Sequence, residues 1–303
     1  MAREITEILV LNRYFAENLF QTVMIIFKKA TDIIGFLHEK AVEKQIGFVP
    51  TMGALHEGHL SLIRLSKQQT DLTVCSIFVN PTQFNDKKDF EKYPSTIDQD
   101  ILLLIKEGCD VLFLPSVDEI YPNGMESNHQ FELGHLNTIL EAAFRKGHFN
   151  GVAQVVSRLL NIVQPHHLFL GQKDFQQCMV IKKLLKIENK NVQLHICPTL
   201  REPDGLAMSS RNLRLNDAQR KLAGVVYQCL VSIASKKEFD SFEKVKKECL
   251  ELLAEKGFEP DYVSLATADD LHLLEEYDNS QPMVALIAAK IGDVRLIDNL
   301  RLQ

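Results

Sequence analysis

The chain has 303 residues, of which 46% are hydrophobic and 24% are charged, a balance typical of a globular protein with one large domain or two. Its formal net charge of −6 argues against a nucleic-acid-coating protein, because phosphate contacts favour an excess of Lys and Arg. No uncharged apolar span reaches the roughly 20 residues that are needed to cross a bilayer. We therefore expect no nucleic-acid partner and no membrane association.

Two further features indicate where the protein works. The six cysteines lie far apart and form no Cys-x-x-Cys pair, so we expect reduced, mostly buried thiols in a cytoplasmic protein. Residues 1–23 lack the basic start and unbroken apolar core of a signal peptide. We interpret them as an N-terminal extension with no assigned function.

From Met24 onward, short apolar runs alternate with helical patterns. Such alternation predicts an α/β fold with a parallel sheet covered by helices on both faces. The predicted strands are Met24–Phe27, Ile46–Val49, Leu72–Val79, Val111–Leu114, Leu168–Leu170 and Val192–Cys197. The predicted helices are one capped by Thr31 and ending near Lys44, and then Leu60–Lys67, Asp98–Glu107, Gly151–Val163 and Phe175–Ile187.

The pattern changes after about Asn212. Two long amphipathic helices are predicted at about Asp217–Ser235 and Ser241–Lys256. Three predicted strands follow, at Asp261–Ala266, Met283–Ala289 and Arg295–Leu300. We therefore expect a main domain at residues 24–207 and a small α+β domain at residues 208–303.

The segment from Ile46 to Ile63 carries the strongest functional signal. It joins an apolar run, a Pro-Thr-Met-Gly turn and a helical pattern, which predicts a strand, a loop and a helix whose N-terminus favours phosphate. His56 and His59 are three residues apart, so both imidazoles can reach one group of phosphate oxygens. Surface or capping histidines are an alternative, and so is a zinc site, although the i, i+4 spacing and a third ligand are missing. We favour a phosphate site and hence nucleotide chemistry.

Another polar segment follows the predicted strand at Leu72–Val79. Asn80 and Gln83 can each donate and accept hydrogen bonds, which suits a ligand with hydroxyl or carboxylate groups. Ordinary turn formation around Pro81 explains the same residues.

Two later loops carry cations. Lys173 follows a predicted strand and suits phosphate, while Asp174 could bind a ribose hydroxyl or cap the next helix. Gln177 lies one turn into that helix and could face the site. The polar segment Ser209–Arg211 could grip a polyphosphate, or could be part of a solvated linker between domains.

Together these motifs resemble the pantothenate synthetase family of the nucleotidyltransferase superfamily. The resemblance runs in order from about Met24 to the end, roughly nine-tenths of the chain. The family's His-x-Gly-His is matched at residues 56–59, and its counterpart of the Lys-Met-Ser-Lys-Ser loop is matched at residues 208–211. The matching segments are Pro50–His59, Val79–Phe84, Gly171–Gln177, Met208–Asn212 and Val294–Asn299.

The resemblance implies a Rossmann-like catalytic domain and an ATP-dependent reaction. Pantoate and ATP would form pantoyl adenylate and pyrophosphate, and β-alanine would then attack to give pantothenate and AMP. The implied catalytic residues are His59, His56, Lys173 and Arg211. The implied ATP-binding residues are Met52, Gly53, His56, Gly58, His59, Gly171, Lys173, Asp174, Leu200, Met208, Ser209, Ser210 and Arg211. Gln83 and Gln177, with Asn80 nearby, would bind pantoate and β-alanine.

The same resemblance implies a cofactor and an oligomeric state. Mg²⁺ would bridge the phosphates, with Asp100 as its protein ligand. A homodimer is typical of the family. The chain departs from the family pattern at Ser95, where an arginine is common, at Gln99 within an acidic stretch, and at Lys146, where proline is common.

Two other functions are compatible with the same residues. A plain nucleotidyltransferase would stop at an adenylylated product, and Gln83 and Gln177 argue against it because both would serve a hydroxy acid. A nucleotide-binding regulator without catalysis is the other alternative. The presence of His59, Lys173 and Arg211 argues against this regulator.

Overall fold

The computed structural model describes residues 9–12, 23–84, 90–91, 93–125 and 130–302. The chain divides into two compact units, which are described separately. The first unit consists of Met1–Asn137, Arg145–Leu170 and Val180–Cys197. The second consists of Thr138–Phe144, Gly171–Met179 and Pro198–Gln303. The predicted boundary between residues 207 and 208 remains a proposal.

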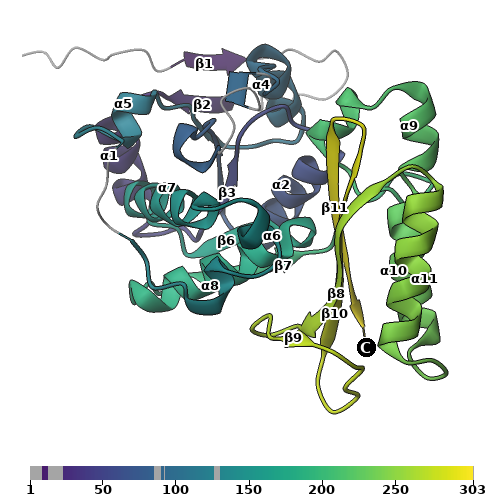
Figure 1. Ribbon diagram of the computed structural model, residues 1–303. Coiled ribbons are helices and arrows are strands. Elements are labelled where there is room, and N and C mark those ends of the chain that lie inside the picture. Colours follow the sequence, from purple (N-terminus) through teal and green to yellow (C-terminus); the bar gives the residue numbers. More distant parts are fainter. Residues whose placement is uncertain (1–8, 13–22, 85–89, 92, 126–129, 303) are drawn as a thin grey trace, which may run out of the picture. The chain divides into compact units, whose positions relative to one another are not determined.

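A seven-stranded sheet in the order β1-β2-β5-β4-β3-β6-β7 forms the centre of the first unit (Figure 1). The strands are β1 (Leu9–Asn12), β2 (Val23–Phe27), β3 (Ile46–Thr51), β4 (Leu72–Ile77), β5 (Val111–Phe113), β6 (His167–Gly171) and β7 (Gln193–Cys197). The pairs β2–β5, β5–β4, β4–β3 and β3–β6 are parallel. β1 pairs antiparallel with β2, so part of the predicted N-terminal extension joins the sheet, while the rest lies outside the described residues.

Helices cover both faces of this sheet, as the sequence predicts. They are α1 (Ala30–Lys40), α2 (Glu57–Gln69), α4 (Ile97–Lys106), α5 (Val117–Ile120) and α7 (His148–Val163), with 3-10 turns η1 (Pro81–Gln83) and η2 (Gly134–Asn137). Leu62 and Ile63 of α2 and Leu104 of α4 share a buried cluster with alternate strand residues such as Val49 and Cys75. On the other face α7 packs against α1 and α5 (Figure 1).

The strand order reverses between β3 and β6. From β3 the chain continues outward to β4, whereas from β6 it continues to β7 on the opposite side. In open α/β sheets, ligands bind beyond the carboxyl ends of the strands at such a reversal. The loop after Thr51 starts at this place.

The second unit contains an antiparallel sheet in the order β11-β10-β8-β9, packed against helices (Figure 1). Its strands are β8 (Glu259–Thr267), β9 (Leu273–Leu274), β10 (Met283–Ile291) and β11 (Val294–Leu302). Its helices are α6 (Glu141–Phe144), η4 (Ser210–Arg214), α9 (Asp217–Leu222), α10 (Val225–Lys236) and α11 (Phe242–Glu255). The 3-10 turn η3 (Gln172–Asp174) also belongs to it, and α8 (Phe175–Ile187) contains residues of both units.

Several predicted boundaries differ from the structure by two to four residues; for example, α1 ends at Lys40 rather than near Lys44, and α7 starts at His148 rather than at Gly151. The first helix starts at Ala30 rather than after a Thr31 cap, and α2 starts at Glu57, three residues before the predicted Leu60. The single helix predicted to follow Asn216 is two helices, α9 and α10, which meet at Gly224. A Cβ atom on Gly224 would lie 2.8 Å from the carbonyl oxygen of Asp204, so this close approach requires glycine. Within the described residues, no helix is long and apolar enough to span a membrane.

Candidate active site

The predicted site residues fall into both units. The first unit holds Met52, Gly53, His56, Gly58, His59, Asn80, Gln83 and Asp100. The second holds Gly171, Lys173, Asp174, Gln177, Leu200, Met208, Ser209, Ser210 and Arg211. Each group is described within its own unit.

His56 and His59 cap the N-terminus of α2 reciprocally. His56 Nδ1 accepts a hydrogen bond from the Gly58 N–H at 3.2 Å, and His59 Nδ1 accepts from the His56 N–H at 3.4 Å. The ring centroids are 4.1 Å apart. Because a backbone N–H can only donate, each Nδ1 is an acceptor, and the proton of each neutral ring is on Nε2. The alternative prediction, that these histidines cap a helix, is therefore confirmed. The same hydrogen bonds orient two Nε2–H donors at a helix N-terminus.

The loop between β3 and α2 is held by Asp100 of α4. Its carboxylate accepts hydrogen bonds from the Ala54 N–H at 2.9 Å, the Leu55 N–H at 2.8 Å and the Thr96 hydroxyl at 3.1 Å. Asp100 is only 1% exposed. Gly53 and Ala54 have φ of +81° and +49°, a left-handed turn that is unfavourable for alanine. The carboxylate therefore stabilises a strained loop.

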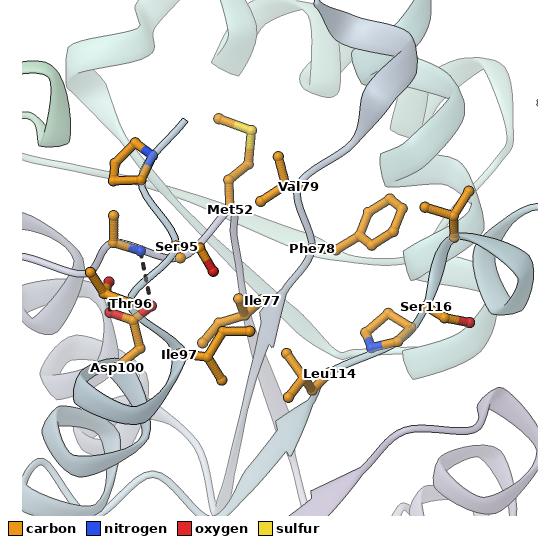
Figure 2. A pocket seen from close by; sticks show the side chains of 15 residues that line it. Met52, Ile77, Phe78, Val79, Ser95, Thr96, Ile97, Asp100, Leu114 and Ser116 are labelled. Atoms are coloured by element: carbon orange, nitrogen blue, oxygen red, sulfur yellow. Dashed lines mark hydrogen bonds between the residues drawn. The ribbon is translucent and has the colours of Figure 1, made fainter. Parts of the chain in front are cut away.

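A cavity of about 230 Å³ lies beside this loop at the carboxyl ends of β3, β4 and β5 (Figure 2). Its walls are mainly apolar, and the hydrogen bond from Ala54 to Asp100 lies at one side. Ser95, at the position where the family commonly has arginine, lines it. The lining residues are Met52, Gly53, Ala54, Ile77, Phe78, Val79, Pro94, Ser95, Thr96, Ile97, Asp100, Leu114, Pro115, Ser116 and Val117.

Asn80 and Gln83 form a buried amide pair at η1. Asn80 Nδ2 donates to Gln83 Oε1 at 3.2 Å and to the Gly151 carbonyl at 3.2 Å, while its Oδ1 accepts from the Tyr121 hydroxyl at 2.7 Å. Gln83 Nε2 lies 2.8 Å from the Met52 sulfur, which is a weak acceptor. Asn80 is thus committed to internal contacts, whereas the Gln83 amide can exchange its sulfur contact for a stronger acceptor.

His148 and Gly151 support this amide pair, although neither was among the site residues predicted from the sequence. His148 Nδ1 lies 2.8 Å from the Gln83 carbonyl oxygen, to which it must donate. A Cβ atom on Gly151 would lie 2.5 Å from the Thr82 carbonyl oxygen, so only glycine lets α7 approach η1 this closely. The signal for His148 was present, because the sequence Arg145–Phe149 is close to a family pattern.

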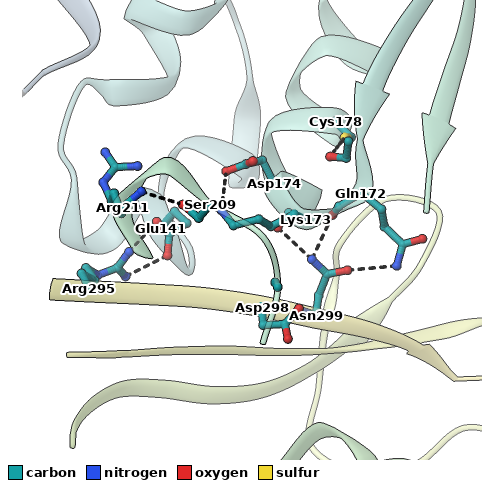
Figure 3. Close-up of polar contacts among 12 residues, drawn as sticks. Glu141, Gln172, Lys173, Asp174, Cys178, Ser209, Arg211, Arg295, Asp298 and Asn299 are labelled. Carbon is teal, nitrogen blue, oxygen red and sulfur yellow. Dashed lines mark hydrogen bonds and ion pairs between the residues drawn. The ribbon is translucent and has the colours of Figure 1, made fainter. Parts of the chain in front are cut away.

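In the second unit, Lys173 lies in the short turn η3 that leads into α8 (Figure 3). Its Nζ lies 3.8 Å from Asp174 Oδ1, and its side chain is 18% exposed. The carbonyl groups of Gln172 and Lys173 each accept a hydrogen bond of 2.9 Å from Asn299 Nδ2. The backbone that carries Lys173 is therefore fixed by a residue of β11.

The two glutamines at the start of α8 have different surroundings. Gln176 is buried; it accepts a hydrogen bond from the Glu141 N–H at 3.0 Å and donates to the Ile139 carbonyl at 2.9 Å. Glu141 is in turn paired with Arg295 (Figure 3). Gln177, the predicted ligand residue, is half-buried and keeps partial access to solvent.

Ser209 caps the turn η4, since its hydroxyl accepts a hydrogen bond from the Arg211 N–H at 3.3 Å. Leu200 is 37% exposed, and Ser210 is buried. Just before this segment, Arg201 and Ala207 form an isolated antiparallel bridge. The structure therefore gives the segment from Met208 to Arg211 a fixed base within the second unit.

The donor set for a metal ion is sparse. Across the described part of the chain, no group of three or more His, Cys, Asp or Glu side chains is placed to hold one. Asp100 is buried, and both of its oxygens accept hydrogen bonds from the protein. Mg²⁺ usually keeps several waters and binds through substrate phosphates with one or two carboxylates. This donor set fits a metal that is held mainly by ATP phosphates.

Comparison with known proteins gives a consistent picture. The sequence model of the family described as Pantoate-beta-alanine ligase matches residues 25–301. The chain is 45% identical over 260 residues to the pantothenate synthetase of Azobacteroides pseudotrichonymphae, covering 85% of this chain and 92% of that protein. It is 42% identical over 287 residues to the pantothenate synthetase of Aquifex aeolicus, covering 92% of this chain and 99% of that protein.

Solved structures agree with the sequence relatives. The pantothenate synthetase of Thermus thermophilus superposes with a TM-score of 0.84 at 36% identity, covering 91% of this chain and 98% of that one. The pantoate-beta-alanine ligase of Francisella tularensis, complexed with beta-gamma ATP and beta-alanine, superposes with a TM-score of 0.77 at 38% identity, covering 91% and 97%. The chain therefore belongs to the pantoate–β-alanine ligase, or pantothenate synthetase, family.

Proposed function

We propose that the chain joins pantoate to β-alanine in two steps that share one acyl adenylate. In the first step, a pantoate carboxylate oxygen bonds to the α-phosphorus of ATP. The bond between the α-phosphorus and the oxygen that bridges it to the β-phosphate breaks, and pyrophosphate leaves. In the second step, the amine of β-alanine bonds to the acyl carbon, AMP leaves with its oxygen, and the amine loses a proton. The products are pantothenate and AMP.

The observation that carries this proposal is the reciprocal capping of His56 and His59. Attack at the α-phosphorus places additional negative charge on phosphate oxygens, which requires donors that are already oriented. The capping bonds occupy both Nδ1 atoms and thereby assign the protons of the neutral rings to Nε2. We assign His59 as the principal acid or electrostatic stabiliser and His56 as its partner.

The remaining roles follow from charge and chemistry. Lys173 and Arg211, with Ser209 and Ser210, would neutralise the triphosphate of ATP. Gln83 and Gln177 would bind the hydroxyl and carboxylate groups of pantoate or β-alanine, and Asn80 would hold Gln83 in place. Asp174 would accept a hydrogen bond from a ribose hydroxyl. The residues assigned to the nucleotide through their backbone or apolar groups are Met52, Gly53, Gly58, Gly171, Leu200 and Met208.

Mg²⁺ would enter with ATP and neutralise charge on the phosphates that the cations also contact. The six cysteines are free thiols, which supports a cytoplasmic location. A homodimer is proposed from the family resemblance alone, and light scattering of the purified protein tests it.

The decisive test measures AMP formation by the purified chain with ATP, Mg²⁺ and pantoate, with and without β-alanine. AMP that requires both organic substrates, with pantothenate appearing one for one, establishes the two-step ligase. Pantoate-dependent pyrophosphate exchange without any effect of β-alanine would leave a nucleotidyltransferase. ATP binding without turnover in both assays would identify a regulator.

A further inference from the structure

Asp298 and Asn299 are adjacent buried polar residues on β11, 5% and 1% exposed. Buried polar side chains are costly unless all their hydrogen-bonding groups are satisfied. The Asn299 side chain is directed at the turn that carries Lys173 (Figure 3), and the Asp298 side chain contacts Arg201. They form what we call the β11 pair.

Asn299 fixes the turn that carries Lys173. Its Nδ2 donates to the carbonyl oxygens of Gln172 and Lys173 at 2.9 Å each, and its Oδ1 accepts from Gln172 Nε2 at 3.1 Å. Within the described residues, the turn η3 has no side-chain cap at its N-terminus, at Gly171. Asn299 does not act as a cap, because it donates to carbonyl groups of the turn rather than accepting from its N–H groups. Aspartate could not replace it, because a carboxylate has no donor.

Asp298 fixes the base of the other cationic segment. Its carboxylate accepts two hydrogen bonds from the Arg201 guanidinium, at 2.6 and 3.1 Å. Arg201 also donates to the Gly205 carbonyl at 3.0 Å and lies over the ring of Tyr227, 4.0 Å from its centroid. The guanidinium is therefore held from several sides, and with it the bridge between Arg201 and Ala207 that precedes Met208.

The two halves of the pair are also joined to each other. Arg201 Nη2 donates to the Asn299 carbonyl at 3.1 Å, and Asp298 Oδ1 accepts from the Asn299 N–H at 2.7 Å. One short stretch of β11 consequently supports both the backbone of Lys173 and the segment that leads to Arg211. Compared with apolar residues of similar volume, a buried ion pair gives little net stability, but it fixes the positions of the two groups that it joins.

We propose that Asp298 and Asn299 are positioning residues that set Lys173 and Arg211 for the triphosphate of ATP. The proposal rests on the roles assigned to these two cations under the proposed function. Lys is a flexible cation, and fixing the backbone from which it extends reduces the freedom that is lost when it meets phosphate. The alternative is that the β11 pair only stabilises the fold of the second unit.

A double-mutant cycle separates the two explanations. We would measure kcat/KM for ATP in pantoate-dependent pyrophosphate exchange for Asn299→Ala, Lys173→Ala and the double variant. Asn299→Ala should reduce kcat/KM by roughly 10²-fold in the wild-type background. In the Lys173→Ala background, Asn299→Ala should reduce kcat/KM by less than about threefold, because the side chain that Asn299 positions is already missing.

Thr267→Val is the matched control. Thr267 is a buried polar residue of the same sheet, and its hydroxyl bonds to Asp270 and to the His272 N–H rather than to either loop. This variant should lower thermal stability as Asn299→Ala does while leaving kcat/KM within about twofold. If Asn299→Ala does not fold, Asn299→Ser keeps one donor and enters the same cycle.

The results that would overturn the positioning role differ from those that would reject the proposed function. Equal factors for Asn299→Ala in both backgrounds would overturn the positioning role, as would a loss in Thr267→Val as large as that in Asn299→Ala. An unchanged rate in Lys173→Ala would show that the cation has no role and would overturn the proposal with it. Absence of pantoate-dependent exchange in the wild-type protein would instead reject the proposed function.

Discussion

The carboxylate of Asp100 accepts hydrogen bonds from two consecutive backbone N–H groups, those of Ala54 and Leu55, although it is 46 and 45 residues away in sequence. This contact connects α4 to the loop that precedes His56. Glycine at position 53 leaves room for this carboxylate, because a Cβ atom there would lie 3.1 Å from Asp100 Oδ2. The sequence suggested Asp100 as a magnesium ligand, and the geometry favours a second role as the anchor of this loop.

Replacing Asp100 with alanine should destabilise the protein even when no metal ion is present. Each buried N–H that loses its acceptor costs roughly 1–3 kcal/mol, so the free energy of unfolding should fall by about 3 kcal/mol in urea denaturation with EDTA. Asp98→Ala, at an exposed acidic residue of the same helix, is the control and should change stability by less than about 0.5 kcal/mol. A variant that is as stable as the wild type, yet needs far more Mg²⁺ for turnover, would instead make Asp100 a metal ligand.

The two nitrogens of His59 can be tested separately. Asparagine can place an acceptor near the Nδ1 position and so keep the cap on the His56 N–H, but it has no group at the Nε2 position. His59→Asn should therefore reduce the rate of adenylate formation by roughly 10²-fold or more while the melting temperature changes little. Pyrophosphate exchange and thermal unfolding measure these two effects.

His59→Gln is the companion variant, because its amide can reach the position of Nε2. We expect it to recover part of the lost rate, at some cost in stability from the missing cap. Near-normal turnover in His59→Asn would remove His59 from the mechanism.

The layered fold was largely predictable because burial produces regular sequence patterns. The strand Ile46–Thr51 is a short, continuously buried run that ends in a turn, and the helix Phe175–Ile187 repeats its apolar residues at a helical period. The break at Gly224 was not predicted, because it depends on the carbonyl of Asp204, some 20 residues earlier. Strand β9 has only two residues, too few to give a pattern.

The site was predictable where one segment contains its own chemistry. His56 and His59 lie within a single helical turn, and their spacing placed both rings at one helix N-terminus. Capping, which the sequence offered as an alternative, is confirmed, and the favoured phosphate role stays a prediction. His148 and Asn299 support predicted residues from 65 and 126 positions away. Both lie in segments that resemble the family pattern, but the sequence alone does not show which residues they contact. Residues that position a site are thus harder to find than residues that contact its ligand.

Stability should fall in mildly acidic solution because of a histidine pair at the edge of the sheet. His167 Nδ1 and His195 Nε2 are 2.9 Å apart, and burial lowers the pKa of both rings, each aided by a neighbouring histidine. The unfolded chain then binds more protons, so stability is fully present above the unfolded pKa of about 6.5 and is lost as the pH falls through the lower folded pKa values.

Urea denaturation between pH 7.5 and 5 measures this loss. His195→Gln keeps a polar partner for His167 but cannot become charged, so its stability should depend less steeply on pH than that of the wild type. His38→Gln, at an exposed histidine of α1, should leave the slope unchanged. Equal slopes for all three proteins would assign the acid sensitivity to other groups.

The thiols should be unreactive in the folded protein. All six cysteines are free and buried, and burial raises the pKa of Cys109 to about 12 and that of Cys197 to about 11. The thiolate is the reactive form, so near pH 8 the raised pKa values oppose attack by a disulfide reagent at Cys109 and Cys197. At Cys229 the hydrogen bond with Cys249 lowers the pKa, and there burial alone opposes the attack. We expect all six thiols to titrate rapidly in denaturant, and in native buffer to react only at the rate at which the protein opens. A single fast-reacting thiol in the native protein, followed by mass spectrometry, would show that one buried site opens without global unfolding.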